Sequence, residues 1–181
     1  MRGNERGFSL VELMIVVVII GLIASVAVFM FTKQVNRSKA GEVHAVFADI
    51  EIQLEKFFTE NGSYPVSTFL IGDMFPKFIP MGEPEVVTGS EEWTQKLRMN
   101  FDKPALYCSY GVSQDLAHIL SFTGLASVLG SAAQAELTAS APSGGPIYGI
   151  LARCNFDGDN VWSWYLKTSW IDRTLVGNPG E

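Results

Sequence analysis

Few side chains in this sequence are of a type and spacing that could carry out chemistry. The two cysteines, Cys108 and Cys154, are too far apart for a C-x-x-C redox motif and fit no metal-binding spacing. The two histidines, His44 and His118, lie in no nucleophile motif, and the sequence contains no phosphate-binding loop, G-x-S-x-G turn or H-E-x-x-H pair. We therefore predict that the protein is not an enzyme and uses no cofactor.

One short cluster of oxygen-bearing side chains, Asp157, Asp159 and Asn160, resembles a cation site. Hard oxygen ligands at alternating positions are typical of calcium loops, but the twelve-residue pattern with its closing glutamate is absent. An acidic turn between two strands is the favoured interpretation, and calcium binding is the weaker alternative.

Glu12 is the most unusual charged residue, because it lies at the start of a long apolar segment. No charged residue occurs from Leu13 to Phe31, and a helix of that length spans roughly the 30 Å hydrocarbon core of a bilayer. An acidic side chain in such a helix costs about 2.5 to 3.5 kcal/mol and usually has a partner or a function. The segment therefore predicts a membrane helix with a functional carboxylate.

Two other interpretations of this apolar segment are weaker. A buried core helix is disfavoured, because the segment is aliphatic on every face. A secretory signal peptide would explain Arg2 and Arg6 ahead of the apolar run, with cleavage near Ala27. However, the run is longer than the roughly 7 to 15 residues of a signal peptide, and Glu12 has no role in one.

The segment from Gly7 to Val17, GFSLVELMIVV, resembles the class III leader junction of type IV prepilins and type II secretion pseudopilins. The resemblance implies cleavage after Gly7 by a prepilin peptidase and N-methylation of the new terminus at Phe8. It also implies that Glu12 of one subunit pairs with the N-terminal amine of a neighbour in a filament. A buried ion pair of this kind is better suited to setting register than to adding stability.

The same resemblance gives the expected partners and location. Basic residues flank the apolar segment on both sides, so charge alone does not orient it. The family implies a cytoplasmic leader, a single-pass inner-membrane form and then an extracellular pilus, or a periplasmic filament for a pseudopilin. Expected partners are other copies of the chain, the peptidase, an inner-membrane assembly platform and ATPases. Nucleic acid is not expected as the main ligand, because the net charge is −6.

The helix is predicted to continue beyond the membrane segment to residue 62. Apolar residues at spacings of three, four and seven form one stripe that must pack on a sheet. They are Val35, Val43, Val46, Phe47, Ile50, Leu54, Phe57 and Phe58. Asn61-Gly62 supplies a stop and Tyr64-Pro65 an extended exit. Phe29 occupies the position at which many major pilins carry a helix-kinking proline. A minor pilin or pseudopilin therefore stays an alternative.

The remaining chain is predicted to form the head. A loop reaches to about residue 90, a strand covers Ala105–Val112, and Ile147–Arg153 pairs with Val161–Lys167 in a hairpin. Residues 113–145 are predicted to be an insertion containing a short helix or a loop. Three tryptophans, Trp162, Trp164 and Trp170, are expected to pack the sheet against the long helix.

Whether the two cysteines are oxidised or reduced depends on the cellular compartment in which they lie. In an exported head, Cys108 and Cys154 could form a disulfide between neighbouring strands, and two reduced core thiols are the alternative.

The expected fold is α+β, with a long N-terminal helix packed against a small antiparallel sheet. The predicted parts are a leader (1–7), a transmembrane and filament-core helix (8–31), its amphipathic continuation (32–62) and a globular head (63–181). The favoured function is a structural subunit of a type IV pilus. A type II secretion pseudopilin or a minor pilin is the alternative, and a membrane-anchored periplasmic binding domain is the alternative from another class.

Overall fold

The computed structural model describes residues 7–65, 74–76, 82–86, 92–99, 105–121, 129–159 and 161–178. The chain divides into two compact units, Met1–Val35 and Asn36–Glu181. The helix α1 (Leu10–Asn61) contributes to both units.

The end of α1 follows from local chemistry. Gly62 has a φ of +73°, a conformation that glycine adopts without steric cost, and its N–H donates to the Phe58 carbonyl at 2.7 Å. The Asn61 side chain donates to the Phe57 carbonyl at 2.9 Å. These bonds satisfy carbonyls of the last turn, so the predicted stop at Asn61-Gly62 is confirmed.

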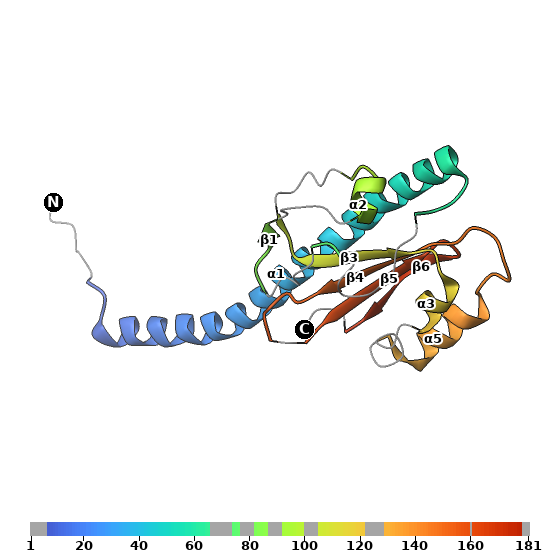
Figure 1. Cartoon of the computed structure of the whole chain (residues 1–181). Helices are drawn as coiled ribbons and strands as arrows, with labels where there is room; N and C mark the ends of the chain where they lie inside the picture. Colours follow the sequence, from blue (N-terminus) through green and yellow to red (C-terminus); the bar gives the residue numbers. More distant parts are fainter. Residues whose placement is uncertain are drawn as a thin grey trace. The chain divides into compact units, whose positions relative to one another are not determined.

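The second unit is built on an antiparallel sheet of four strands in the order β3-β4-β5-β6 (Figure 1). The strands are β3 (Cys108–Ser113), β4 (Gly149–Cys154), β5 (Ser163–Thr168) and β6 (Ile171–Gly177). A smaller ladder joins β1 (Glu85–Val86) to β2 (Ala105–Leu106). Short helices α2 (Glu92–Lys96), α3 (Leu116–Ser121) and α5 (Gly130–Ala139) complete the described elements. The predicted α+β class is confirmed.

The predicted strand over Ala105–Val112 is divided in two, and this detail of the prediction is wrong. Tyr107 lies between β2 and β3, and its backbone N–H donates to the Glu42 carboxylate of α1 at 3.0 Å. Because this N–H is used by a side chain, it is not part of a strand ladder at that position.

Each face of the sheet has its own apolar core. On one face, the amphipathic stripe of α1 packs against alternate strand residues, and Val43, Ile50 and Leu54 are each 0% exposed. On the other face, Leu151 and Leu166 of the sheet pack with Ile119 of α3 and Leu137 of α5. Figure 1 shows these two helices together beside the sheet. The described helices within 113–145 are therefore part of the core of the head.

The tryptophans differ from expectation. Trp164 and Trp170 pack with the second core, on the sheet face that does not meet α1, so the prediction that they pack the sheet against the long helix is wrong. The reason is strand alternation: Tyr165 faces α1, which places Trp164 on the opposite face. Trp162 lies 3.9 Å from the Arg153 guanidinium, measured to the ring centroid.

Candidate functional site

The residues predicted to mark the leader junction lie at the very start of α1. Gly7, Phe8 and Ser9 precede the first helical residue, Leu10, and the Phe8 side chain is 86% exposed. The Gly7–Phe8 peptide bond is therefore outside the helix. A protease acts more readily on non-helical, exposed backbone, so the geometry is compatible with cleavage at this bond.

A capping box positions Glu12, and this role was missed by the sequence reasoning. The Ser9 N–H donates to Glu12 Oε2 at 2.9 Å, and the Glu12 N–H donates to Ser9 Oγ at 3.2 Å. The signal was present in the sequence as Ser9-Leu10-Val11-Glu12, a serine followed three residues later by glutamate. The two bonds satisfy N–H groups at the helix start and hold the carboxylate one turn from Phe8.

The described part of the first unit consists mainly of exposed apolar side chains. The large apolar side chains described between Leu10 and Phe31 are each 47 to 76% exposed. Two of its hydroxyl groups are satisfied by the helix itself, because Ser25 donates to the Leu22 carbonyl and Thr32 to the Val28 carbonyl. Among the described residues, α1 is the one helix that is long and apolar enough to cross a bilayer.

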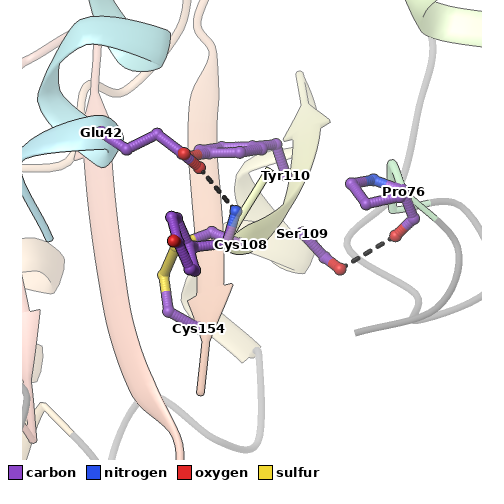
Figure 2. The surroundings of a disulfide bond; sticks show 7 residues. Glu42, Pro76, Cys108, Ser109, Tyr110 and Cys154 are labelled. Atoms are coloured by element: carbon purple, nitrogen blue, oxygen red, sulfur yellow. Dashed lines mark hydrogen bonds between the residues drawn. A yellow bond between two sulfur atoms is a disulfide. The ribbon is translucent and has the colours of Figure 1, made fainter. Parts of the chain in front are cut away.

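A second polar site lies on α1 within the head unit. Glu42 is 5% exposed, and its Oε1 accepts hydrogen bonds from the Tyr107 N–H at 3.0 Å and from the Tyr110 hydroxyl at 3.1 Å. Figure 2 shows Glu42 reaching from the helix toward Tyr110 and the backbone beside Cys108. Burial, and then the Glu42 charge, raise the pKa of Tyr110 well above its ordinary value. The tyrosine therefore remains a donor to the carboxylate.

Lys39, one turn before Glu42, binds the same end of the head. Its Nζ donates to the Gly82 carbonyl at 2.9 Å and to the Phe156 carbonyl at 2.7 Å. Gly82 in turn donates to the Asn155 carbonyl at 2.9 Å. We call Lys39 and Glu42 with these contacts the head anchor, because they join α1 to the strands and to the turn after β4.

The two cysteines lie beside the head anchor. Cys108 and Cys154 are directly opposite each other in the β3–β4 ladder, each 0% exposed, and their sulfurs form a disulfide (Figure 2). The bond joins the first residue of β3 to the last residue of β4, so it closes the end of the sheet from which Glu42 accepts its hydrogen bonds.

The acidic turn proposed as a weak calcium candidate uses its carboxylates locally. Asp157 Oδ1 accepts from the Asp159 N–H at 3.3 Å, and Asp159 Oδ1 accepts from the Val161 N–H at 2.7 Å. Asn160 lies outside the described residues. Within the part of the chain that the structure describes, no three His, Cys, Asp or Glu side chains come together as metal ligands.

The histidines are placed by packing and local charge. His44 makes an edge-to-face contact with the Tyr165 ring, with 6.4 Å between centroids. His118 Nδ1 lies 3.7 Å from Asp115 on the exposed side of α3.

Comparison with known proteins identifies relatives of this chain. Residues 2–28 match the prokaryotic N-terminal methylation motif. The chain is 42% identical over 61 residues to the type IV major pilin protein PilA of Myxococcus xanthus. This alignment covers 34% of this chain and 28% of that protein. It is 34% identical over 87 residues to the type II secretion system core protein G of Dickeya chrysanthemi. This alignment covers 47% of this chain and 54% of that protein.

A third relative is the fimbrial protein EcpC of Eikenella corrodens, 29% identical over 72 residues, or 40% of this chain and 47% of that protein. The alignments thus span between 28% and 54% of the relatives. No solved structure matches the chain. The resemblance to type IV pilins and type II secretion pseudopilins, inferred from residues 7–17, is confirmed.

Proposed function

From the relationship of this chain to type IV pilins and type II secretion pseudopilins, we propose that it is a structural subunit of a type IV pilus. The observation that carries the proposal is the first part of α1: a long series of exposed apolar side chains among the described residues, with Glu12 as its one acidic residue. An apolar surface of this size is stable in water only when lipid or other protein covers it. A membrane covers it before assembly, and neighbouring helices cover it in a filament.

The proposed assembly begins with processing. Hydrolysis of the Gly7–Phe8 bond by a prepilin peptidase releases the leader and leaves a free amine on Phe8. Methylation then replaces one hydrogen of that amine with a methyl group from a sulfonium donor, and the amine can still be protonated. The mature terminus thus carries a positive charge close to Glu12.

The charge pair then specifies the position of each new subunit. Two opposite charges in an apolar environment gain much from meeting, whereas either one alone is costly to bury. The proposed partner of Glu12 is the Phe8 ammonium of a neighbouring copy. The Ser9 N–H that now binds Glu12 shows that this carboxylate already accepts a donor at the helix terminus. An inner-membrane platform and cytoplasmic ATPases would drive the transfer out of the bilayer.

The second candidate is a type II secretion pseudopilin. The observation that favours it is the similarity to core protein G, which extends over 87 residues and so reaches beyond the N-terminal motif. A pseudopilin would use the same processing and pairing but would form a short periplasmic filament. Surface exposure of the assembled protein distinguishes the two candidates.

The test is intact-mass analysis of the protein from membranes and from filaments sheared off the cell surface of the native host. A mature chain that begins at methylated Phe8 and is abundant in the sheared fraction supports the pilus subunit. A processed chain that is confined to the cell envelope favours the pseudopilin. An unprocessed chain that begins at Met1 in both fractions would contradict both and favour a membrane-anchored binding domain.

A further inference from the structure

Arg153 lies in β4 on the face of the sheet that does not meet α1. Its neighbours in the chain, Ala152 and Cys154, belong to the core against α1. Ala152 and Cys154 share one face because side chains alternate along a strand, and Arg153 between them is on the other face. In the register of the sheet, Arg153 lies directly beside Trp164 of β5.

Two tryptophan rings hold the Arg153 guanidinium. Its Cζ lies 3.9 Å from the centroid of the Trp162 ring and 5.0 Å from the centroid of the Trp164 ring. Contacts of this kind attract a cation to the faces of the rings. They do not satisfy the guanidinium N–H groups, because these donors point outward in the plane of the group. The rings therefore fix the guanidinium in place and leave its donors in need of acceptors.

The Arg153 charge is not compensated by the described part of the chain. Among the described residues the structure shows no ion pair for Arg153, and its Nε is buried without a hydrogen-bond partner. Burial lowers the pKa of Arg153, and no described carboxylate offsets this effect. The group still carries its charge, since an arginine side chain is not deprotonated in proteins. Buried polar groups usually have partners, so this guanidinium requires an anion.

A second donor without an acceptor lies close by in the chain. Phe156 belongs with Cys154 to the core against α1, so Asn155 between them faces the same side as Arg153. Asn155 is 0% exposed, and its Nδ2 has no hydrogen-bond partner among the described residues. This end of the sheet face therefore has more donors than acceptors.

Arg173 shows how an arginine on the same sheet face is satisfied where a carboxylate is close. It lies in β6 between Ile171 and Leu175, which both pack in the second core. Its Nε and Nη2 donate to the two carboxylate oxygens of Glu136, on α5. The helix thus supplies the counterion of Arg173, whereas the described residues supply none for Arg153.

The geometry around Arg153 selects a carboxylate. Rings over the faces of the guanidinium leave an approach along its plane, and the flat carboxylate matches the planar fork of donors. The neighbouring side chains are apolar or aromatic: Trp162 and Trp164 are partly buried, and Val161 is 44% exposed. They suit an acidic side chain with apolar neighbours better than an acidic sugar, whose many hydroxyl groups would each need a partner. Tryptophan and arginine are also enriched at the centres of protein interfaces.

We infer that Arg153, Trp162 and Trp164 form a binding surface for a glutamate or aspartate side chain on a peptide segment of a partner protein. Charge complementarity carries the choice of occupant, because the surface presents one fixed cation without a described counterion. The inference is independent of the proposed filament function, since it concerns a contact of the head and is tested on solubilised protein.

The test compares two photoreactive dipeptides on the full-length protein in detergent: acetyl-photoleucine-glutamate-amide and its glutamine counterpart. We expect the glutamate probe to label residues 161–164 about tenfold more than the glutamine probe, the ratio that roughly 1.4 kcal/mol of binding energy produces. Arg153→Met keeps an apolar stem without the charge, so labelling by the two probes should become equal. Arg173→Met is the matched control and should leave labelling unchanged, because Arg173 is already paired with Glu136.

Equal labelling of the unmodified protein by the two probes would overturn the carboxylate site, and this arm does not depend on the folding of any variant. Undiminished labelling of an Arg153→Met protein with unchanged thermal unfolding would overturn it too. Competition then identifies the source of the carboxylate. Displacement by acetyl-glutamate-amide at lower concentrations than by glucuronate supports a peptide partner, whereas the reverse order would overturn it and assign the surface to an acidic sugar.

Discussion

The two parts of α1 are both rich in aliphatic residues, but they differ in what covers them. In the first part, the described large apolar side chains from Leu10 to Phe31 are 47 to 76% exposed, whereas Val43, Ile50 and Leu54 in the second part are fully buried. The second part has apolar residues on one face, and a single sheet can cover one face. The first part is apolar on every face, so only lipid or several other helices can cover it.

The two parts also differ in how they use a glutamate. Glu12 has a local partner, Ser9, at the start of its own helix. Glu42 is 5% exposed and accepts hydrogen bonds from Tyr107 and Tyr110, which belong to the head. Under the proposed function, the first carboxylate serves contacts between chains, whereas the second makes contacts within the chain. One helix would then separate assembly from folding.

The largest expected effect is that of Glu12→Ala on assembly. The substitution removes one member of the proposed charge pair and leaves the neighbouring ammonium unpaired in an apolar environment, which costs about 3 to 5 kcal/mol. We expect filaments to be lost from the sheared fraction while the thermal unfolding of the head is unchanged.

The matched control is Glu60→Ala, because Glu60 is an exposed glutamate on the second part of the same helix. It should assemble normally. Loss of filaments in both variants, or in neither, would contradict a specific role for Glu12.

The second prediction concerns the disulfide that closes the head next to Glu42. Its cysteines are 46 residues apart in the sequence, and a cross-link of that span stabilises the folded state by about 4 kcal/mol in the chain-entropy model. The double variant Cys108→Ala and Cys154→Ala should lower the free energy of unfolding of the head by about this amount, measured by chemical denaturation. Protein in the membrane fraction should keep its N-terminal processing, and a parallel loss of cleavage after Gly7 would contradict the separation of the two parts.

Two isoleucines two residues apart on α1 give a direct test of burial. Ile50 is 0% exposed and Ile52 is 63% exposed, so the same substitution reports on opposite faces of the helix. Ile50→Ala should cost about 3 kcal/mol of stability, because a buried apolar side chain leaves a cavity, and Ile52→Ala should cost less than about 0.5 kcal/mol. Equal losses in thermal unfolding would show that the helix does not pack on the sheet by this face.

The sequence was sufficient for the elements that follow from periodicity and from a specific motif. It predicted the helix, its end at Asn61-Gly62 and the hairpin of β4 and β5, because each depends on local residues. It did not predict the break at Tyr107, which depends on a carboxylate 65 positions earlier in the chain. Long-range pairing of this kind leaves no local pattern.

The same limit applies to the sites. The predicted leader junction and the role proposed for Glu12 rest on one continuous motif, and the Ser9 capping box could also have been predicted from its spacing. The head anchor could not, since Lys39 and Glu42 bind residues that are distant in the sequence. The wrong placement of Trp164 arose because the face of a strand that meets a helix depends on its register.

The head anchor provides the fourth prediction. Glu42→Ala removes the acceptor used by the Tyr107 N–H and the Tyr110 hydroxyl, so two donors in a buried region lose their partner. We expect a loss of about 3 kcal/mol in the free energy of unfolding. Glu42→Gln retains a carbonyl oxygen at this position and should cost about half as much or less. A substitution by alanine that destroyed filaments without destabilising the head would place Glu42 in the assembly surface and overturn the comparison with Glu12.

The smallest effect is a change in the dependence of stability on alkaline pH, and it should be confined to the head. Burial, and then the hydrogen bond and charge of Glu55, raise the pKa of Tyr64 to about 12 from 10.0. Because the folded state retains this proton more strongly than the unfolded state, the stabilisation is complete below about pH 10 and is lost as the pH rises through about 12.

Tyr64→Phe keeps the ring that stacks on Phe58 but removes this titration. We expect the stability of the variant to fall less steeply between these pH values, by up to about 1.4 kcal/mol per pH unit in chemical denaturation. The decline should not vanish, because Tyr110, Tyr148 and Tyr165 also have raised pKa values and remain in the variant. Identical slopes for the two proteins would mean that the Tyr64 hydroxyl is already open to water, and that α1 is held at its end by ring packing alone.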